Sequence, residues 1–202
     1  MTAASTPLPK DLRLGLFLLL ALVMLATRSH HFGALPDASW AVFFAAGFYL
    51  RGSARWAYPA LMALAVVVDW AVISSQGLDF WGHYCVSPAY AFLVASYAAL
   101  WFGGSWLRAH HRGLHLRDLG LLAASAVAAA VACFVISNGT FYWLSPNVPS
   151  PSFGGWVKNV GDWFVTFMTT TLAYIGIGAG LHVATATVAK SFGGAAAARA
   201  AR

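Results

Sequence analysis

The residues best suited to chemistry lie in one stretch, residues 79–90, with the sequence DFWGHYCVSPAY. Within it, Ser87 followed by Pro88 is typical of an N-cap and the first position of a helix. Cys85 is therefore predicted just ahead of a helix N-terminus, where the partial positive charge and nearby His83 favour the thiolate. A thiolate is a soft metal ligand or a reactive thiol, which makes Cys85 a candidate for either role. The alternative is an inert interfacial thiol.

Asp69 and His31 are further candidates. Asp69 lies deep inside an apolar run, where a charge is costly in lipid and is by default functional or paired, facing the interior of a bundle. Its alternative role is a structural hydrogen-bond acceptor for Trp or Tyr side chains. His31 follows the first apolar run and is either a donor to a ligand or a solvated interfacial residue.

Aromatic and amide side chains accompany these candidates. Tyr84 adjoins the cysteine, and a later polar stretch contains Asn138, Tyr142 and Trp143. Such residues can line the mouth of a binding site. Tyrosine and tryptophan also gather at membrane interfaces as an aromatic belt, which is the competing interpretation.

Missing motifs exclude several classes of function. The sequence has no G-x-x-x-x-G-K-[ST] phosphate loop, so the chain is not expected to hydrolyse ATP itself. It has neither H-E-x-x-H nor G-x-S-x-G, and glutamate is absent, which disfavours a hydrolytic enzyme. The net charge of +6 is spread over short loops rather than a basic patch, so it does not indicate nucleic-acid binding. Cys133 lies in an Ala/Val-rich run and is expected to be buried and inert.

Membrane helices are the elements that must position these residues. Of the 202 residues, 60% are hydrophobic and only 9% are charged, too few to keep a domain of this length in water. The charges separate apolar runs whose lengths suit a hydrocarbon core that needs about 20 helical residues. The sequence therefore predicts an all-α membrane protein, a six-transmembrane-helix bundle forming a single domain over residues 1–202. The predicted spans are approximately 14–27, 36–50, 56–75, 88–107, 118–137 and 162–188, followed by a cytoplasmic tail at 189–202.

Two of these runs carry a specific structural prediction. The second is short, so it either begins near Phe32 and includes Pro36 or forms a partial helix. The last contains Gly176 and Gly180, which give it a small face that allows close approach of another helix in the bundle or of another membrane subunit.

The distribution of basic residues predicts topology. With six spans and both termini in the cytoplasm, ten of the twelve Lys and Arg residues lie inside, and Arg28 and Lys158 lie outside. If the second run does not cross, the N-terminus lies outside and the count becomes nine to three. Both arrangements place the loops 76–87 and 138–162 on the outer face.

The stretch His83-Tyr-Cys-Val-Ser-Pro-Ala-Tyr90, together with residues 137–144 (SNGTFYWL) and the size of the bundle, resembles the BtuM-type cobalamin transporters. These are similar to the substrate-binding S-components of energy-coupling-factor (ECF) transporters. The resemblance implies a multi-pass protein of the bacterial inner membrane that takes up cobalamin from the periplasmic side. It implies that Cys85 ligates cobalt, that Tyr90 is the accompanying motif tyrosine, and that the cysteine can displace an upper ligand such as cyanide. Asp69 and His31 match by location.

The resemblance leaves the partners open. S-components commonly carry an Ala-x-x-x-Ala face on the first span, whereas Ala21 and Ala26 are five positions apart here. Coupling to an ECF module of transmembrane subunit and ATPases, and transport without one, both remain hypotheses. The alternatives are an S-component for another vitamin, a haem or redox membrane protein using His30, His31, His83 and Cys85, and a purely structural membrane subunit.

Overall fold

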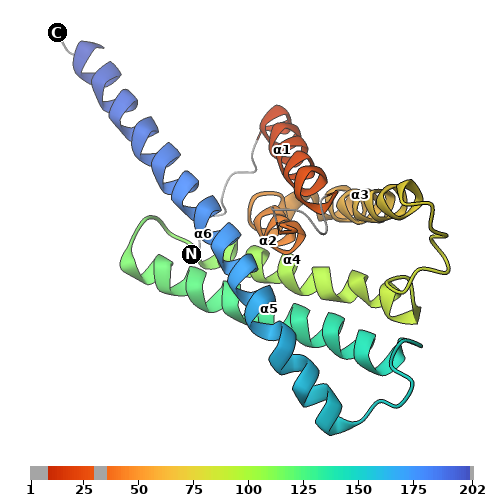
Figure 1. The fold of residues 1–202 in the computed structure, drawn as a ribbon. Coiled ribbons are helices and arrows are strands. Elements are labelled where there is room, and N and C mark those ends of the chain that lie inside the picture. Colours follow the sequence, from red (N-terminus) through yellow and green to blue (C-terminus); the bar gives the residue numbers. More distant parts are fainter. Residues whose placement is uncertain (1–8, 30–35, 201–202) are drawn as a thin grey trace.

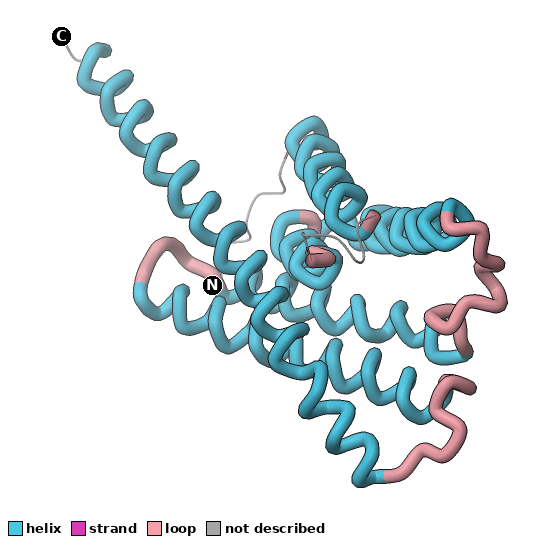
Figure 2. Tube along the Cα trace, in the orientation of Figure 1, coloured by secondary structure: helices cyan, strands magenta, loops and turns pink. Residues whose placement is uncertain are grey.

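The computed structural model describes residues 9–29 and 36–200, and of 192–200 the backbone alone. It is 82% helical, and its described part contains no strand, which confirms the all-α class (Figures 1 and 2). The elements are α1 (Lys10–Arg28), α2 (Ser39–Tyr49), η1 (Arg51–Ser53), α3 (Ala54–Ser75), η2 (Pro88–Phe92), α4 (Leu93–His110), α5 (Leu116–Leu144) and α6 (Phe153–Ala200).

Four helical segments of the described chain are long and apolar enough to cross a membrane: Arg51–Ser75, Pro88–His110, Leu116–Leu144 and Phe153–Ser191. The protein is therefore membrane-embedded. α1 is not among the four because it carries charges at both of its ends, and α2 has 11 residues. The predicted number of six spans thus stays a prediction.

α2 takes the shorter of the two forms expected for the second apolar run. It begins at Ser39, after Pro36, and its 11 residues rise about 16 Å, roughly half of a hydrocarbon core. The chain nevertheless returns to the end of the molecule where α1 begins. Arg13 Nη1, near the start of α1, donates to Ser53 Oγ, 3.2 Å away, just before α3. α1 and α3 consequently start at the same end of the molecule.

α5 and α6 extend beyond their predicted limits. The expected outer loop 138–162 is only residues 145–152, because α5 continues to Leu144 and α6 begins at Phe153. Thr140 is accommodated inside the longer α5 because its hydroxyl donates to the Ile136 carbonyl, 2.7 Å away. α6 also continues through most of the predicted tail, since it stays helical to Ala200 and projects alone beyond the other helices (Figure 1).

Glycines allow α2 and α4 to pack at backbone contact. A Cβ added to Gly104 would lie 1.9 Å from the Phe44 carbonyl oxygen, and one added to Gly47 would lie 2.1 Å from the Trp101 carbonyl oxygen. A Cβ at Gly176 or Gly180 would meet no atom of the described chain within 4 Å. The prediction that the last span packs closely within this chain through these two glycines is therefore wrong.

The core lies around α2. Phe43 is fully buried and stacks on Tyr97 of α4, with ring centroids 4.4 Å apart. Cys133 of α5 is also fully buried in this cluster, which confirms its predicted burial.

Candidate functional site

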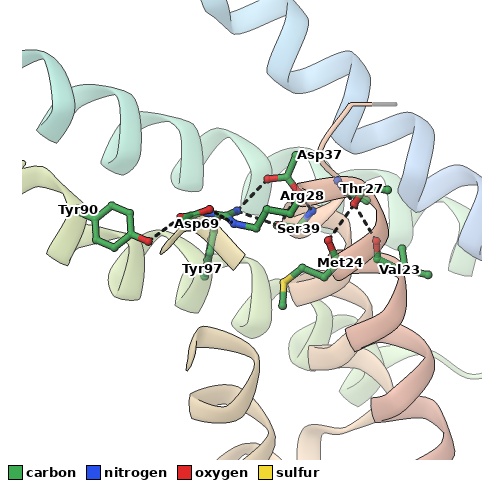
Figure 3. A network of polar contacts seen from close by, with 10 residues as sticks. Val23, Met24, Thr27, Arg28, Asp37, Ser39, Asp69, Tyr90 and Tyr97 are labelled. Carbon is green, nitrogen blue, oxygen red and sulfur yellow. Dashed lines mark hydrogen bonds and ion pairs between the residues drawn. The ribbon is translucent and has the colours of Figure 1, made fainter. Parts of the chain in front are cut away.

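Arg28 is the centre of a buried polar cluster at one end of the bundle. Its side chain comes from the last turn of α1 and is 4% exposed. The guanidinium donates from Nε to Asp69 Oδ1 and from Nη2 to Asp69 Oδ2, both over 2.7 Å (Figure 3). This bidentate geometry is the strongest that arginine and a carboxylate form. Asp69 is therefore paired, as its position in an apolar run predicted.

The remaining donor of the guanidinium joins two more helices. Arg28 Nη1 lies 2.9 Å from Asp37 Oδ2, 3.1 Å from Ser39 Oγ and 3.0 Å from Tyr97 OH. We define the Arg28 cluster as Arg28, Asp37, Ser39, Asp69, Tyr90 and Tyr97. It connects α1, α2, α3, η2 and α4, so it stabilises the relative positions of these elements.

Local hydrogen bonds fix the start of α2 and the end of α1 beside the cluster. Asp37 accepts from the backbone N–H and the hydroxyl of Ser39, over 2.8 and 2.6 Å, at the start of α2. Thr27 accepts from the backbone N–H of Ala38 over 3.1 Å, which holds the end of α1 against the same helix start. Buried polar groups in a membrane protein need such partners, because lipid offers none.

Tyr90 connects the cluster to the cysteine-containing stretch. Its hydroxyl donates to Asp69 Oδ2 over 2.6 Å. Tyr90 lies in η2, which begins at Pro88 after an extended Ser87, so the predicted helix start is confirmed, although its first turn is a 3-10 helix. Ser87 Oγ makes no cap hydrogen bond.

Cys85 lies in the loop 76–87, is half-buried and forms no disulfide. Its backbone N–H donates to His83 Nδ1 over 3.3 Å. The rings of His83 and Tyr84 are 4.5 Å apart. These three consecutive residues therefore form one small surface group, which we call the Cys85 triplet.

The electrostatic environment of Cys85 differs from the prediction. Burial, its largest influence, raises the pKa of the thiol, and the Asp69 carboxylate also raises it, whereas the Tyr84 hydroxyl and Arg28 lower it. The net pKa shift is upward, so the expectation that the helix start favours the thiolate is wrong for the free protein. A metal that displaces the thiol proton is then needed to form the thiolate. The same contact with Cys85 raises the pKa of Tyr84.

Three further predicted residues, Asn138, Tyr142 and Trp143, lie on α5. Asn138 Oδ1 accepts from Asn159 Nδ2 of α6 over 2.9 Å. Tyr142 is 8% exposed, and its hydroxyl donates to the Ser152 carbonyl over 3.1 Å, which closes the α5–α6 loop. Trp143 packs against Tyr142 and is 45% exposed.

A hydrogen bond joins the two loops at this end of the molecule. Asn147 Nδ2 donates to the Tyr84 carbonyl over 3.1 Å, so the Cys85 triplet is tied to the α5–α6 loop. Beside it, an open recess of about 470 Å³ is lined by Gln76, Leu78, Asp79, Gly82, His83 and Tyr84. His30 and His31 lie outside the described residues.

Sequence reasoning missed Arg28, Asp37, Ser39, Tyr97 and Asn147 as parts of this end of the molecule. A signal for Arg28 did exist. A carboxylate inside a membrane helix needs a cation, and the predicted topology put two basic residues, Arg28 and Lys158, on the outer side.

Neither a family model nor a curated protein matches the chain. In the described residues, no three His, Cys, Asp or Glu side chains form a group able to hold a metal ion. Cys85 can supply one soft sulfur ligand to a metal whose other ligands come from elsewhere. A macrocycle meets this condition, since it leaves only axial positions to the protein.

Proposed function

We propose that the protein binds cobalamin at the outer face of the bacterial inner membrane and moves it inward, with Cys85 as the axial ligand of cobalt. The observation that carries the proposal is a free, half-buried cysteine in the loop 76–87, within the stretch 83–90 that resembles BtuM-type transporters. A corrin holds cobalt through its own ring nitrogens, so one protein ligand is enough.

The Cys85 triplet and the Arg28 cluster have different roles in this proposal. Cys85 contacts the cobalt, while His83 and Tyr84 form the surface beside it. Asp69 and Arg28 contact each other and act on the thiol through space, so they are positioning residues. Tyr90 holds the start of η2 against Asp69 and thereby positions the loop.

The proposal includes a ligand exchange on cyanocobalamin. The Cys85 thiol loses its proton, Sγ forms a bond to cobalt(III), and cyanide leaves with that proton as hydrogen cyanide. No electron is transferred. A corrinoid is larger than the recess beside the triplet, so binding requires the loop 76–87 to separate from the α5–α6 loop, with loss of the hydrogen bond from Asn147 to Tyr84.

The test is the absorption spectrum of cobalamin added to the detergent-purified protein. We expect a shifted spectrum with wild type and with Cys133→Ala, and no shift with Cys85→Ala. Cys133 is the matched control because it is a fully buried cysteine away from the loop. Vitamin binding that is unchanged in Cys85→Ala would instead favour an S-component in which this cysteine is incidental, and haem absorption before any addition would favour the redox alternative.

A further inference from the structure

A second cavity lies at the end of the molecule away from Cys85, between α2, the α4–α5 loop and α6. Its volume is about 440 Å³. The lining from α2 runs from Ala41 to Tyr49, which are about 12 Å apart along the helix axis. Most of the wall is apolar, with Phe44 and Phe48 on one side and Ile175 on the other. The cavity is therefore a long apolar slot.

Polar groups gather at one end of this slot. The Tyr49 hydroxyl lies 2.9 Å from His182 Nδ1, and the His182 ring lies 5.9 Å from that of His111. Phe48 packs between them and Arg108, whose guanidinium carbon is 5.4 Å from the Phe48 ring centroid. The rim of the slot thus carries the imidazoles of His111 and His182, and the half-buried Arg108 lies beside Phe48, next to the lining.

The surrounding surface is basic as well. The exposed side chains of Arg112, in the α4–α5 loop, and Arg117, in the first turn of α5, adjoin residues that line the cavity. Asp118 itself lines the cavity, but it is buried and accepts from the backbone N–H of Arg112 over 2.9 Å. Arg108, Arg112 and Arg117 together outweigh its charge, so the surroundings of the rim are positive and suit an occupant with an anionic head and an apolar tail.

We propose that this cavity binds an anionic phospholipid, with one acyl chain in the slot along α2 and its phosphate at Arg108 and His111. The length and apolar lining fit a chain, and the charge at the rim fits a phosphate. A zwitterionic lipid lacks the net charge that would match this rim. The inference is independent of the cobalamin proposal, because it uses none of the residues near Cys85.

The chain offers a matched pair of variants for the slot. Gly178 lines the cavity and Gly176 does not, and an added Cβ meets nothing within 4 Å at either position. Gly178→Leu should therefore fill the slot without a clash at its Cβ, while Gly176→Leu adds the same side chain to the same helix outside it. For the rim, the pair is Arg108→Gln and Arg55→Gln.

The experiment is thermal unfolding of the detergent-purified chain with added phosphatidylglycerol or phosphatidylcholine of equal chain length. We expect phosphatidylglycerol to raise the Tm of wild type by about 2–4 °C more than phosphatidylcholine does. Gly178→Leu and Arg108→Gln should lose this difference, and Gly176→Leu and Arg55→Gln should keep it. Native mass spectrometry of the rim variants gives a second measure of bound lipid that does not depend on the stability of Gly178→Leu.

Three results would overturn the proposal. Equal shifts with the two lipids in wild type would mean that the lipid acts only as a general apolar solvent. A preserved difference in both Gly178→Leu and Arg108→Gln would place the lipid elsewhere. Inorganic phosphate reproducing the full shift would show that the rim binds the anion without a chain.

Discussion

The Arg28 cluster and the Cys85 triplet differ in how far their polar groups already have hydrogen-bond or ion-pair partners. The Arg28 cluster is buried, and the bidentate pair between Arg28 and Asp69 uses both carboxylate oxygens. The Cys85 triplet lies in a loop, half-buried to exposed, beside an open recess. A ligand can reach the second region without breaking an ion pair, whereas the first must stay intact to hold four helices together. A polar residue in a membrane helix, such as Asp69, can therefore serve to hold helices together.

Removal of the Arg28 guanidinium should be the most destabilising of the substitutions considered. Arg28→Met leaves Asp37 and Asp69 without their cation, and we expect it to lower the free energy of unfolding by about 3–5 kcal/mol. Thermal or denaturant unfolding in detergent measures the loss. In the double variant with Asp69→Asn, the loss should be smaller than the sum of the two single losses.

An exposed ion pair gives the control for that experiment. Lys158 and Asp162 are 2.7 Å apart on α6, but their side chains are 77% and 51% exposed. Lys158→Met should change the stability by less than about 1 kcal/mol. An equal effect of the two substitutions would contradict the structural role given to the Arg28 cluster.

Two glycines differ in the same way: Gly104 lies in a close contact between helices, whereas Gly176 faces open space. Gly104→Ala places a Cβ against the Phe44 carbonyl, and we expect a loss of about 1–3 kcal/mol because α2 and α4 must separate. Gly176→Ala adds the same methyl group in open space and should raise helix stability by up to about 1 kcal/mol. Unfolding of the two variants side by side checks the opposite signs.

The pH dependence of cobalamin binding tests whether the Cys85 thiol loses its proton on ligation. Burial raises the pKa of its thiol. With aquacobalamin the leaving group is water and the thiol proton is released to solvent, so affinity for it should rise by about tenfold per pH unit below that pKa and level off above it. Titration of aquacobalamin into the protein at several pH values measures this slope. Cys85→Ala should bind weakly and with no such slope.

Substitution of Tyr90 should affect stability but not cobalt ligation, unlike substitution of Cys85. Tyr90→Phe removes the hydrogen bond to Asp69 but leaves the bidentate arginine contact, so we expect a loss of about 1 kcal/mol in stability. The spectral shift of bound cobalamin should persist, because the sulfur ligand is unchanged. Loss of that shift in a folded Tyr90→Phe would make Tyr90 part of the ligand contact.

The parts that the sequence predicted correctly depend on local pattern. The length of the apolar runs predicted helices, the Ser87-Pro88 pair predicted the start of η2, and the apolar surroundings of Cys133 predicted its burial. The need of Asp69 for a partner was also predictable, because a lone charge is costly in lipid.

The parts that were missed depend on how helices face each other. From the sequence, Arg28 is interpreted as a loop charge that indicates membrane topology. The parallel packing of α1 and α3 is what brings it to Asp69. Gly47 and Gly104 stand in runs without an obvious small face, yet they make the close contact that the Gly176–Gly180 pattern was expected to make. The raised pKa of Cys85 reflects burial by the folded loop, which no local pattern encodes.

The central claim, ligation of cobalt by Cys85, is tested most directly by cobalt-edge X-ray absorption of the protein with bound cobalamin. We predict one sulfur atom in the first coordination shell of cobalt in wild type and in Cys133→Ala, and none in Cys85→Ser. A shell of nitrogen, carbon and oxygen alone in the wild-type complex would contradict the claim, even if the protein binds cobalamin tightly.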